Sequence, residues 1–280
     1  MKKVSIQGIR GAFHEEAARR YFGPMIQILP KLDFNDTLQS VAQNEADYAV
    51  MAVENSIAGT IHSNYSLLQS SGLSIQGEVY LRIRQNLMAL PESKIEAIER
   101  VYSHPMAIAQ CRNFFESRPQ IQLIESEDTA LSAREIAKNK QHNVAAIAGK
   151  LAGKIYGLEL LAQGIETHRK NYTRFLIIGR KCLNQIYNKA SLVFSLPHKQ
   201  GALAGVLSLI AQHSINLTKI ESVPVVGEPW HYRFYLDISF EKKASYHSML
   251  QEIRPHCQNF QLLGSYLKAE MPAEPKMETS

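Results

Sequence analysis

A continuous run of apolar residues, Tyr48 to Val53, places the strongest constraint on how this chain folds. The run lacks the apolar–polar alternation of a strand with one wet face, so it is typical of a parallel strand buried between helices. Strand and helix patterns alternate on both sides of it through the first two-thirds of the chain. This alternation predicts an α/β fold with a mainly parallel sheet, divided into two lobes.

Other segments of this region fit the same scheme. Short apolar segments predict strands at 4–7, 73–90 (one or two strands), 101–103, 120–124, 144–147 and 173–178. Helical periodicity predicts helices at 13–22, 36–44, 105–117, from 128 or 129, and 149–156, with a further helix ending near Gly72. Asp36, Ser103 and Thr129 stand at positions where their side chains would cap helices.

The pattern changes after Arg180. Residues 182–189 read as a linker, and the segment that follows predicts the order βαββαβ, which is the ferredoxin-like α+β unit. We therefore expect a two-lobed domain at 1–181 and a second domain at 190–269. Residues 270–280 carry two prolines and no aromatic residue, which predicts a flexible tail.

Bulk composition excludes several classes of protein. The formal net charge is +5, but no dense basic run appears, so no nucleic-acid partner is expected. The three cysteines, Cys111, Cys182 and Cys257, are far apart, which argues against a disulfide framework and a structural zinc site. No secretion signal and no stretch of about 18 apolar residues is visible. We expect a cytoplasmic protein with no membrane partner and no metal.

Polar loops lie next to the predicted apolar strands, and these are the candidate ligand-binding segments. They are residues 54–60, 103–105, 126–129 and 171–174. Each loop alone reads more readily as a helix cap or turn. Because ligands of open α/β sheets bind beyond the carboxyl ends of strands, the loops together predict a pocket for a small anion. Gly8 and Gly11 lack the remaining glycines of a dinucleotide loop, so we interpret them as a tight turn.

Ordered motifs in these loops resemble the prephenate dehydratase family over almost the entire chain. The matching segments are Gly8-x-x-Gly11-x-Phe13, Val53-Glu54-Asn55-Ser56, Ser103-His104-Pro105 with Gln110, Ala145-Ala146-Ile147-Ala148, and Thr173-Arg174-Phe175. The resemblance implies a two-lobed catalytic domain similar to periplasmic binding proteins, followed by an ACT regulatory domain. No mutase domain precedes the matching segments, so we expect a monofunctional enzyme.

The resemblance implies that prephenate loses carbon dioxide and water to give phenylpyruvate, in phenylalanine biosynthesis. Because aromatisation drives this elimination, no cofactor is expected. Thr173 is implied as the group that meets the leaving hydroxyl, with Glu54 and Gln110 as further catalytic residues. Glu127 is another candidate for a supporting acid. The implied substrate-binding residues are Asn55, Ser56, Ser103, Thr129 and Arg174. Arg174 fits either the pyruvyl carboxylate or a structural ion pair equally well.

The C-terminal segment resembles an ACT domain that binds phenylalanine and pairs in a homodimer or homotetramer. The residues implied at the effector site are Gly201, Ala202, Leu203, Asn216, Leu217, Glu221 and Ser222. Val223 stands where the family motif has arginine, which removes a planar group with five donors.

Two other functions compete with the dehydratase interpretation. Arogenate dehydratase performs the same elimination on the amino-acid analogue, and no residue in the sequence separates the two substrates. A non-catalytic small-ligand sensor would also have a two-lobed α/β domain, but it would not require the Thr173-Arg174-Phe175 motif. A structural interaction module fits the C-terminal segment alone.

Overall fold

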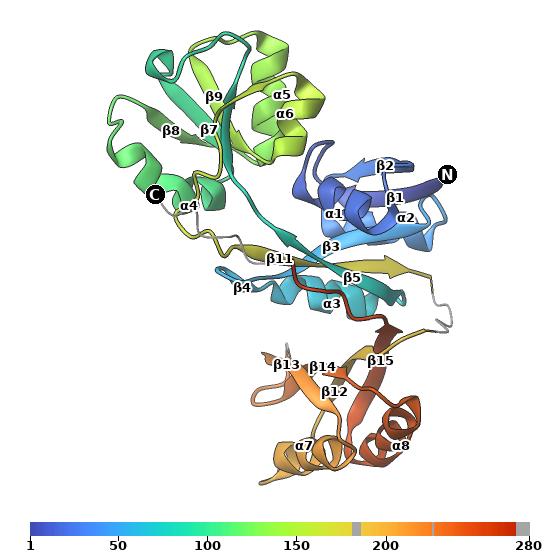
Figure 1. The fold of residues 1–280 in the computed structure, drawn as a ribbon. Helices are drawn as coiled ribbons and strands as arrows, with labels where there is room; N and C mark the ends of the chain where they lie inside the picture. The colour runs from blue at the N-terminus through green and yellow to red at the C-terminus, as the bar shows by residue number, and fades with distance from the viewer. Residues whose placement is uncertain (181–185, 226, 273–280) are drawn as a thin grey trace. The chain divides into compact units, whose positions relative to one another are not determined.

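A computed structural model describes residues 1–180, 186–225 and 227–272 (Figure 1). These residues form two compact units. Unit 1 comprises residues 1–61, 79–175 and the described residues 271–272, and unit 2 comprises residues 62–78 and 176–270. This division assigns segments 62–78 and 176–180 to the C-terminal unit, whereas the sequence predicted one domain through 181. Residues 182–185 of the predicted linker and 273–280 of the predicted tail lie outside the described residues.

The first lobe contains the apolar run Tyr48 to Val53. Its strands pair in the order β2-β1-β3-β11-β5, with β4 beside β3, and β1 runs parallel to both β2 and β3. The strands are β1 (Lys2–Gln7), β2 (Ile26–Lys31), β3 (Tyr48–Asn55), β4 (Gly59–Thr60), β5 (Ser74–Arg82) and β11 (Tyr172–Gly179). The helices that follow β1 and β2 are α1 (Phe13–Phe22) and α2 (Phe34–Ala42). Residues 49–53 are buried, as predicted.

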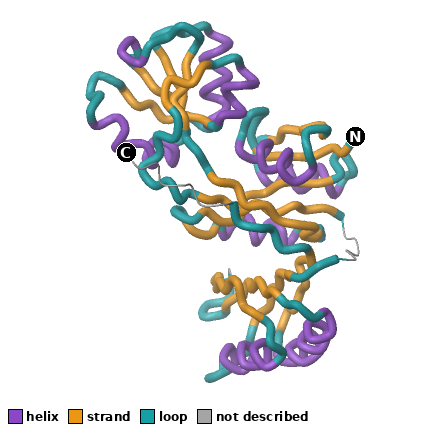
Figure 2. The backbone as a smooth tube through the Cα atoms, in the orientation of Figure 1, coloured by secondary structure: helices purple, strands orange, loops and turns teal. Residues whose placement is uncertain are grey.

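The second lobe has a mixed sheet in the order β10-β6-β9-β7-β8, flanked by helices (Figure 2). Its strands are β6 (Asn86–Ala89), β7 (Arg100–Ser103), β8 (Gln122–Glu125), β9 (Val144–Ala148) and β10 (Glu159–Ala162). Its helices are η1 (Ile95–Ala97), α4 (Pro105–Glu116), α5 (Thr129–Asn139) and α6 (Lys150–Tyr156). Strands β7, β8 and β9 are parallel, whereas β6 and β10 are antiparallel to their neighbours. The sheet is therefore parallel only in part.

Two crossing segments connect the lobes, one between β5 and β6 and the other between β10 and β11. They are hydrogen-bonded to each other. The Ile83 N–H donates to the Asn171 carbonyl at 2.8 Å, and the Ile165 N–H donates to the Gln85 carbonyl at 2.9 Å. The buried carboxylate of Glu166 accepts from the Gln85 N–H at 2.9 Å. These bonds hold the two crossings together where the lobes meet.

The glycine loop after β1 is a tight turn, as predicted. Gly8 and Gly11 have φ angles of 91° and 89°, in the left-handed region that favours glycine. A Cβ on Gly11 would lie 2.9 Å from the Cα of Ala152 in α6. Gly11 is therefore needed both for the turn and for close packing of this loop against the second lobe.

Unit 2 contains the predicted βαββαβ order. Its elements are β12 (Lys189–Ser195), α7 (Ala202–Gln212), β13 (Asn216–Pro224), β14 (Tyr232–Ser239), α8 (Lys243–Ile253), η2 (Arg254–His256) and β15 (Gln258–Tyr266). The antiparallel sheet has the order β13-β14-β12-β15. Apolar residues of α7 and α8 pack on one face (Figure 1). Helix α3 (His62–Ser70) packs near the sheet through Tyr65, whose ring centroid lies 5.3 Å from that of Tyr235.

The helix starts differ from three sequence expectations. Asp33, rather than Asp36, caps α2, and its side chain accepts a hydrogen bond from the Asp36 N–H. The cap of α4 is His104 instead of Ser103, and the cap of α5 is Asp128 instead of Thr129. In each case the capping side chain accepts a hydrogen bond from an N–H in the first turn of its helix. Asp36 and Thr129 lie inside their helices, and Ser103 lies one residue before the cap, so none of the three is at the capping position.

Candidate functional site

A pocket of about 360 Å³ lies in unit 1 and is lined from both lobes. The first lobe contributes Gln7, Ala12, Phe13, His14, Ala52, Asn55, Ala58, Ile61, Thr173 and Phe175. The second lobe contributes His104, Met106, Ala107, Gln110, Asp128 and Thr129, and the first crossing contributes Ile83 and Gln85. The lining is mostly apolar with a few polar side chains, which is typical of a site for a small organic molecule.

Three helices begin at this pocket. They are α1, α4 and α5, whose first residues are Phe13, Pro105 and Thr129. Ala12 precedes α1 and offers no side-chain cap, whereas His104 and Asp128 cap the other two helices. Backbone N–H groups at a helix start carry a partial positive charge and bind anions. No lysine or arginine lines the pocket within the described chain, so these helix starts are its main positive features.

A chain of side-chain amides leads to the hydroxyl of Thr173. The Asn55 Nδ2 donates to Thr173 Oγ1 at 2.9 Å and to Asn171 Oδ1 at 2.8 Å. The Asn171 Nδ2 in turn donates to Gln110 Oε1 at 3.0 Å. Because Thr173 Oγ1 accepts a hydrogen bond here, its own proton is free to point toward a ligand in the pocket. The predicted residues Asn55, Gln110 and Thr173 are therefore brought together in one wall.

Asn171 is the link that the sequence argument did not single out. It is fully buried and bridges the Asn55 amide to the Gln110 amide across the two lobes. The signal in the sequence was its position two residues before Thr173. Residues at i and i+2 of a strand share a face, so an amide there was the one to examine.

Thr129 lines the pocket as predicted, but two predicted serines do not. The Ser103 hydroxyl is buried and donates to the Ile147 carbonyl at 2.7 Å. The Ser56 hydroxyl donates to the Lys170 carbonyl at 3.1 Å and accepts from the Tyr172 N–H at 2.9 Å. Both hydroxyls are hydrogen-bonded to backbone groups, and neither residue is part of the pocket lining.

The charged residues from the prediction also lie outside the lining. Arg174 is 3% exposed, and its Nη1 lies 3.9 Å from the Glu54 carboxylate. This arrangement corresponds to the ion-pair alternative for Arg174. Glu127 is exposed and lines a separate hollow with Lys31 and Arg134.

Two buried titratable groups near the pocket are uncharged at neutral pH. Burial lowers the pKa of His14 to about 4, and its ring meets Phe34 and Phe175 edge-on at 5.3 and 5.1 Å between centroids. Burial, with a contribution from the Glu166 charge, raises the pKa of the Cys111 thiol to about 12. A thiol with so high a pKa is not a nucleophile at neutral pH, so the role of Cys111 in α4 is packing.

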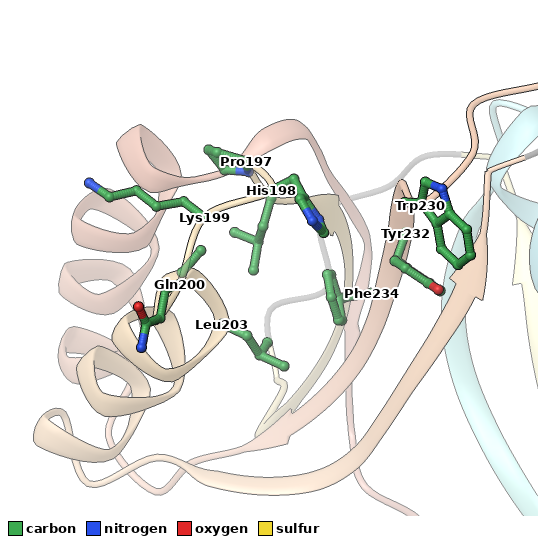
Figure 3. Close-up of a pocket in the computed structure, with 10 residues that line it drawn as sticks. Pro197, His198, Lys199, Gln200, Leu203, Trp230, Tyr232 and Phe234 are labelled. Atoms are coloured by element: carbon green, nitrogen blue, oxygen red, sulfur yellow. The ribbon is translucent and has the colours of Figure 1, made fainter.

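A second pocket of about 360 Å³ lies in unit 2 between the β12–α7 loop and β14 (Figure 3). Leu203, Trp230, Tyr232 and Phe234 supply its apolar lining, and His198 stands at the loop side. Of the predicted effector residues, Ala202 and Leu203 line this pocket, and Gly201 is the cap residue of α7 just before them.

The remaining predicted effector residues lie along β13 and are not part of the lining of that pocket. Asn216 lines a different hollow, with Ser239 and Lys242. Leu217 packs at the border of the unit 2 core. The Glu221 carboxylate lies 3.6 Å from the His62 imidazole and 3.4 Å from Lys219 Nζ, and Ser222 pairs with Phe234 in the sheet. The predicted set is thus divided between α7 and β13 within unit 2.

No helix in the described residues is long and apolar enough to cross a membrane.

Comparison with known proteins places this arrangement in a family. Residues 4–183 match the sequence model of the family described as prephenate dehydratase. The protein named arogenate dehydratase/prephenate dehydratase 2, chloroplastic, of Arabidopsis thaliana is 37% identical over 283 residues, covering 94% of this chain and 72% of that protein.

Two solved structures resemble the whole chain. Prephenate dehydratase from Arthrobacter aurescens, solved in complex with L-Phe, has a TM-score of 0.86 at 27% identity and covers 98% of this chain and 93% of that one. A structure described as GqqA, a novel type of quorum quenching acylase, has a TM-score of 0.87 at 28% identity, covering 96% and 98%. With the family match over more than half of the chain, the conclusion is that the protein belongs to the prephenate dehydratase family of carbon–oxygen lyases.

Proposed function

We propose that the pocket of unit 1 converts prephenate to phenylpyruvate, with Thr173 as the group that protonates the leaving oxygen. The observation that carries this proposal is the hydrogen bond from Asn55 Nδ2 to Thr173 Oγ1 at 2.9 Å in the pocket wall. This hydrogen bond uses a lone pair of the Thr173 oxygen and leaves the hydroxyl proton of Thr173 available to the substrate. Family membership supplies the reaction class, and the geometry supplies a candidate for the donor.

The elimination needs little more than this donor. The bond to the ring carboxylate breaks, carbon dioxide leaves, and the electron pair completes the aromatic ring. The ring C–O bond breaks with it, and the oxygen leaves as water after taking a proton from Thr173. Overall, one proton is taken up from solvent for each prephenate dianion. A free threonine hydroxyl is a weak acid, but the amide chain of Asn55, Asn171 and Gln110 polarises it through successive hydrogen bonds.

The helix starts are our candidates for holding the substrate carboxylates. Prephenate carries two carboxylates, and no described lysine or arginine lines the pocket. The start of α1 has no side-chain cap and offers N–H donors from the first lobe, whereas the first N–H groups of α4 are already bound to His104. An arginine fixed on the departing carboxylate would stabilise the ground state and slow decarboxylation, so neutral donors suit this step. Thr129, at the start of α5, is a further hydrogen-bonding group.

The proposed activity is tested by supplying the purified protein with prephenate and following phenylpyruvate absorbance. We expect saturable turnover of prephenate. Arogenate is assayed in parallel through phenylalanine formation, because the Arabidopsis relative is named for both activities. Turnover of arogenate alone would replace the substrate in our proposal, and turnover of neither would overturn it. Hydrolysis of an acyl amide is the control for the acylase likeness.

We further propose that the βαββαβ domain is an ACT domain and that its pocket, shown in Figure 3, binds phenylalanine. An apolar hollow beside Leu203 and Phe234 suits a phenyl ring, and His198 and the loop backbone offer polar contacts. A relative of known structure was solved with L-Phe. Lys199 and Gln200 point away from the aromatic side chains in Figure 3, so we assign them no contact with the ring.

Phenylalanine is expected to change the fluorescence of Trp230 in a saturable way. Trp230 is the single tryptophan of the chain and lines this pocket, so a ligand there alters its surroundings directly. The variant Leu203→Glu places a charge in the apolar lining and is expected to abolish the response. Ala204→Glu, on an exposed position of the same helix, is the matched control and is expected to keep it. An unchanged response in Leu203→Glu would contradict the assignment.

Pairing of chains through this domain, as a homodimer or homotetramer, also stays a proposal. It is supported by partly exposed apolar side chains on the outer strands of the sheet, with Ile220 on β13 at 41% and Leu262 on β15 at 39% exposure. A cytoplasmic location is supported by the described cysteines Cys111 and Cys257, which are unpaired thiols.

A further inference from the structure

The side chain of Gln85 ends in a buried oxygen that has no hydrogen-bond partner among the described residues. Gln85 is 3% exposed and lines the pocket of unit 1. Nearly all buried polar atoms in folded proteins are hydrogen-bonded, and leaving one unpaired costs free energy. A polar atom that is unpaired at the wall of a ligand pocket is explained most simply if the ligand supplies its partner.

The backbone holds Gln85 at a fixed place in the pocket. Its N–H donates to the Glu166 carboxylate and its carbonyl accepts from Ile165, so both backbone groups are bound to the second crossing. Two residues earlier, the Ile83 N–H donates to the Asn171 carbonyl. The segment that carries Gln85 therefore runs beside the start of β11, which carries Thr173.

One other lining residue, His14, has a buried side-chain nitrogen without a hydrogen-bond partner in the described chain. Its ring lies edge-on to Phe34 and Phe175, and aromatic faces attract the positive edge of an imidazole. The oxygen of Gln85 is an acceptor, which an aromatic face cannot satisfy in this way. Among the lining residues, Gln85 is therefore the one whose unpaired atom indicates that the ligand carries a hydrogen-bond donor.

The chemistry of prephenate identifies that donor. Its two carboxylates and its keto group only accept hydrogen bonds, so the ring hydroxyl is the one group of the dianion with a hydrogen to donate. We propose that Gln85 Oε1 accepts the hydrogen of the substrate's ring hydroxyl, an inference that rests on the proposed function. With that hydrogen directed to Gln85, a lone pair of the same oxygen faces Thr173, which is the orientation that protonation requires.

The test compares wild type with Gln85→Met, which keeps the length of the side chain and removes its acceptor. We expect kcat/KM for prephenate to fall about 10- to 100-fold, as for loss of one buried hydrogen bond. Phenylpyruvate, the product, has the same side arm but no ring hydroxyl. Its competitive inhibition constant is expected to change less than about twofold, because the bond to Gln85 is absent in that complex in both proteins.

Three further measurements separate this role from a structural one. Gln122→Met, at an exposed glutamine of β8, is the matched control and is expected to behave as wild type. Gln85→Asn keeps a neutral amide oxygen on a shorter side chain and is expected to retain more prephenate turnover than Gln85→Met. Thermal unfolding of each variant establishes that it is folded.

Several outcomes would overturn the inference. Equal weakening of prephenate turnover and phenylpyruvate inhibition in Gln85→Met would indicate a disturbed pocket. Activity in Gln85→Asn below that in Gln85→Met would count against a role of the amide oxygen. An effect on arogenate but not on prephenate would move the contact to the amino group. If wild type turned over neither substrate, the proposed function itself would fail, and wild type alone would show this.

Discussion

Replacing Thr173 by valine is expected to lower kcat for prephenate by about 100- to 10,000-fold, the usual contribution of a positioned proton donor. Valine has nearly the shape of threonine but no hydroxyl, so the pocket wall is kept while the donor is lost. KM is expected to change little, because the proton is transferred only as the C–O bond breaks. Initial rates of phenylpyruvate formation over a range of prephenate concentrations measure both constants.

The structural reason for so large an effect lies in how the hydroxyl is held. Thr173 is 8% exposed and lies in the pocket lining, where Asn55 Nδ2 donates to its oxygen. A water molecule in its place would have neither this orientation nor the polarisation by the amide chain. The expected loss therefore reflects geometry and hydrogen bonding more than the intrinsic acidity of threonine.

Thr173→Ser is the matched control, since serine keeps the hydroxyl and removes one methyl group. We expect it to retain activity within about tenfold of wild type, as one lost methyl affects packing more than chemistry. A Thr173→Val enzyme that is folded and keeps wild-type kcat would show that another group protonates the leaving oxygen. In that event Gln110, whose side chain also lines the pocket, would be examined next.

Replacing Lys189 by methionine is expected to destabilise unit 2 by about 3–5 kcal/mol, the usual result of removing one partner from a buried ion pair. Lys189 Nζ donates to both carboxylate oxygens of Glu78, at 2.9 and 2.8 Å. The two side chains are 3% and 0% exposed. Without the ammonium group, Glu78 keeps a buried charge that water cannot reach, and that charge has to be neutralised or exposed.

Urea unfolding followed by circular dichroism measures this loss. Lys199→Met, at an exposed lysine of the same unit, is the control and is expected to change stability by less than about 1 kcal/mol. The double variant Glu78→Leu/Lys189→Met removes both charges and is expected to recover much of the lost stability. A loss below about 1 kcal/mol in Lys189→Met would contradict the prediction and place the pair with weak surface ion pairs.

The strands that were not predicted from the sequence lie at sheet edges. Strand β2 ends one sheet and contains Pro30, and β10 is a four-residue strand at the end of the other. Edge strands are only partly buried, so they need neither a continuous apolar run nor a regular alternation. Their pairing depends on the neighbouring strand, which lies elsewhere in the sequence.

Predicted site residues lie together where their motifs are on neighbouring strands of one sheet. Thr173 on β11 and Asn55 at the end of β3 belong to strands adjacent in the sheet, so their motifs meet directly. Ser56 and Ser103 were harder to place, because a serine hydroxyl at the end of a strand can turn either to the pocket or to a nearby carbonyl. Ser56 and Ser103 both bond to the backbone, a choice that depends on carbonyls far away in sequence.

The sequence alone determined the alternation of strands and helices, the βαββαβ unit and the motif that contains Thr173, since hydrophobic periodicity and local motifs are properties of short segments. Only the tertiary structure decided which polar groups meet. It placed Asn171 between Asn55 and Gln110, bound Arg174 to Glu54, and turned Gln85 from the lobe crossing into the pocket. These contacts join residues that are far apart in the sequence, such as Asn55 and Asn171, which are 116 positions apart. A side chain's direction at such a distance is set by strand pairing and by the need to satisfy buried polar groups, which no local pattern records.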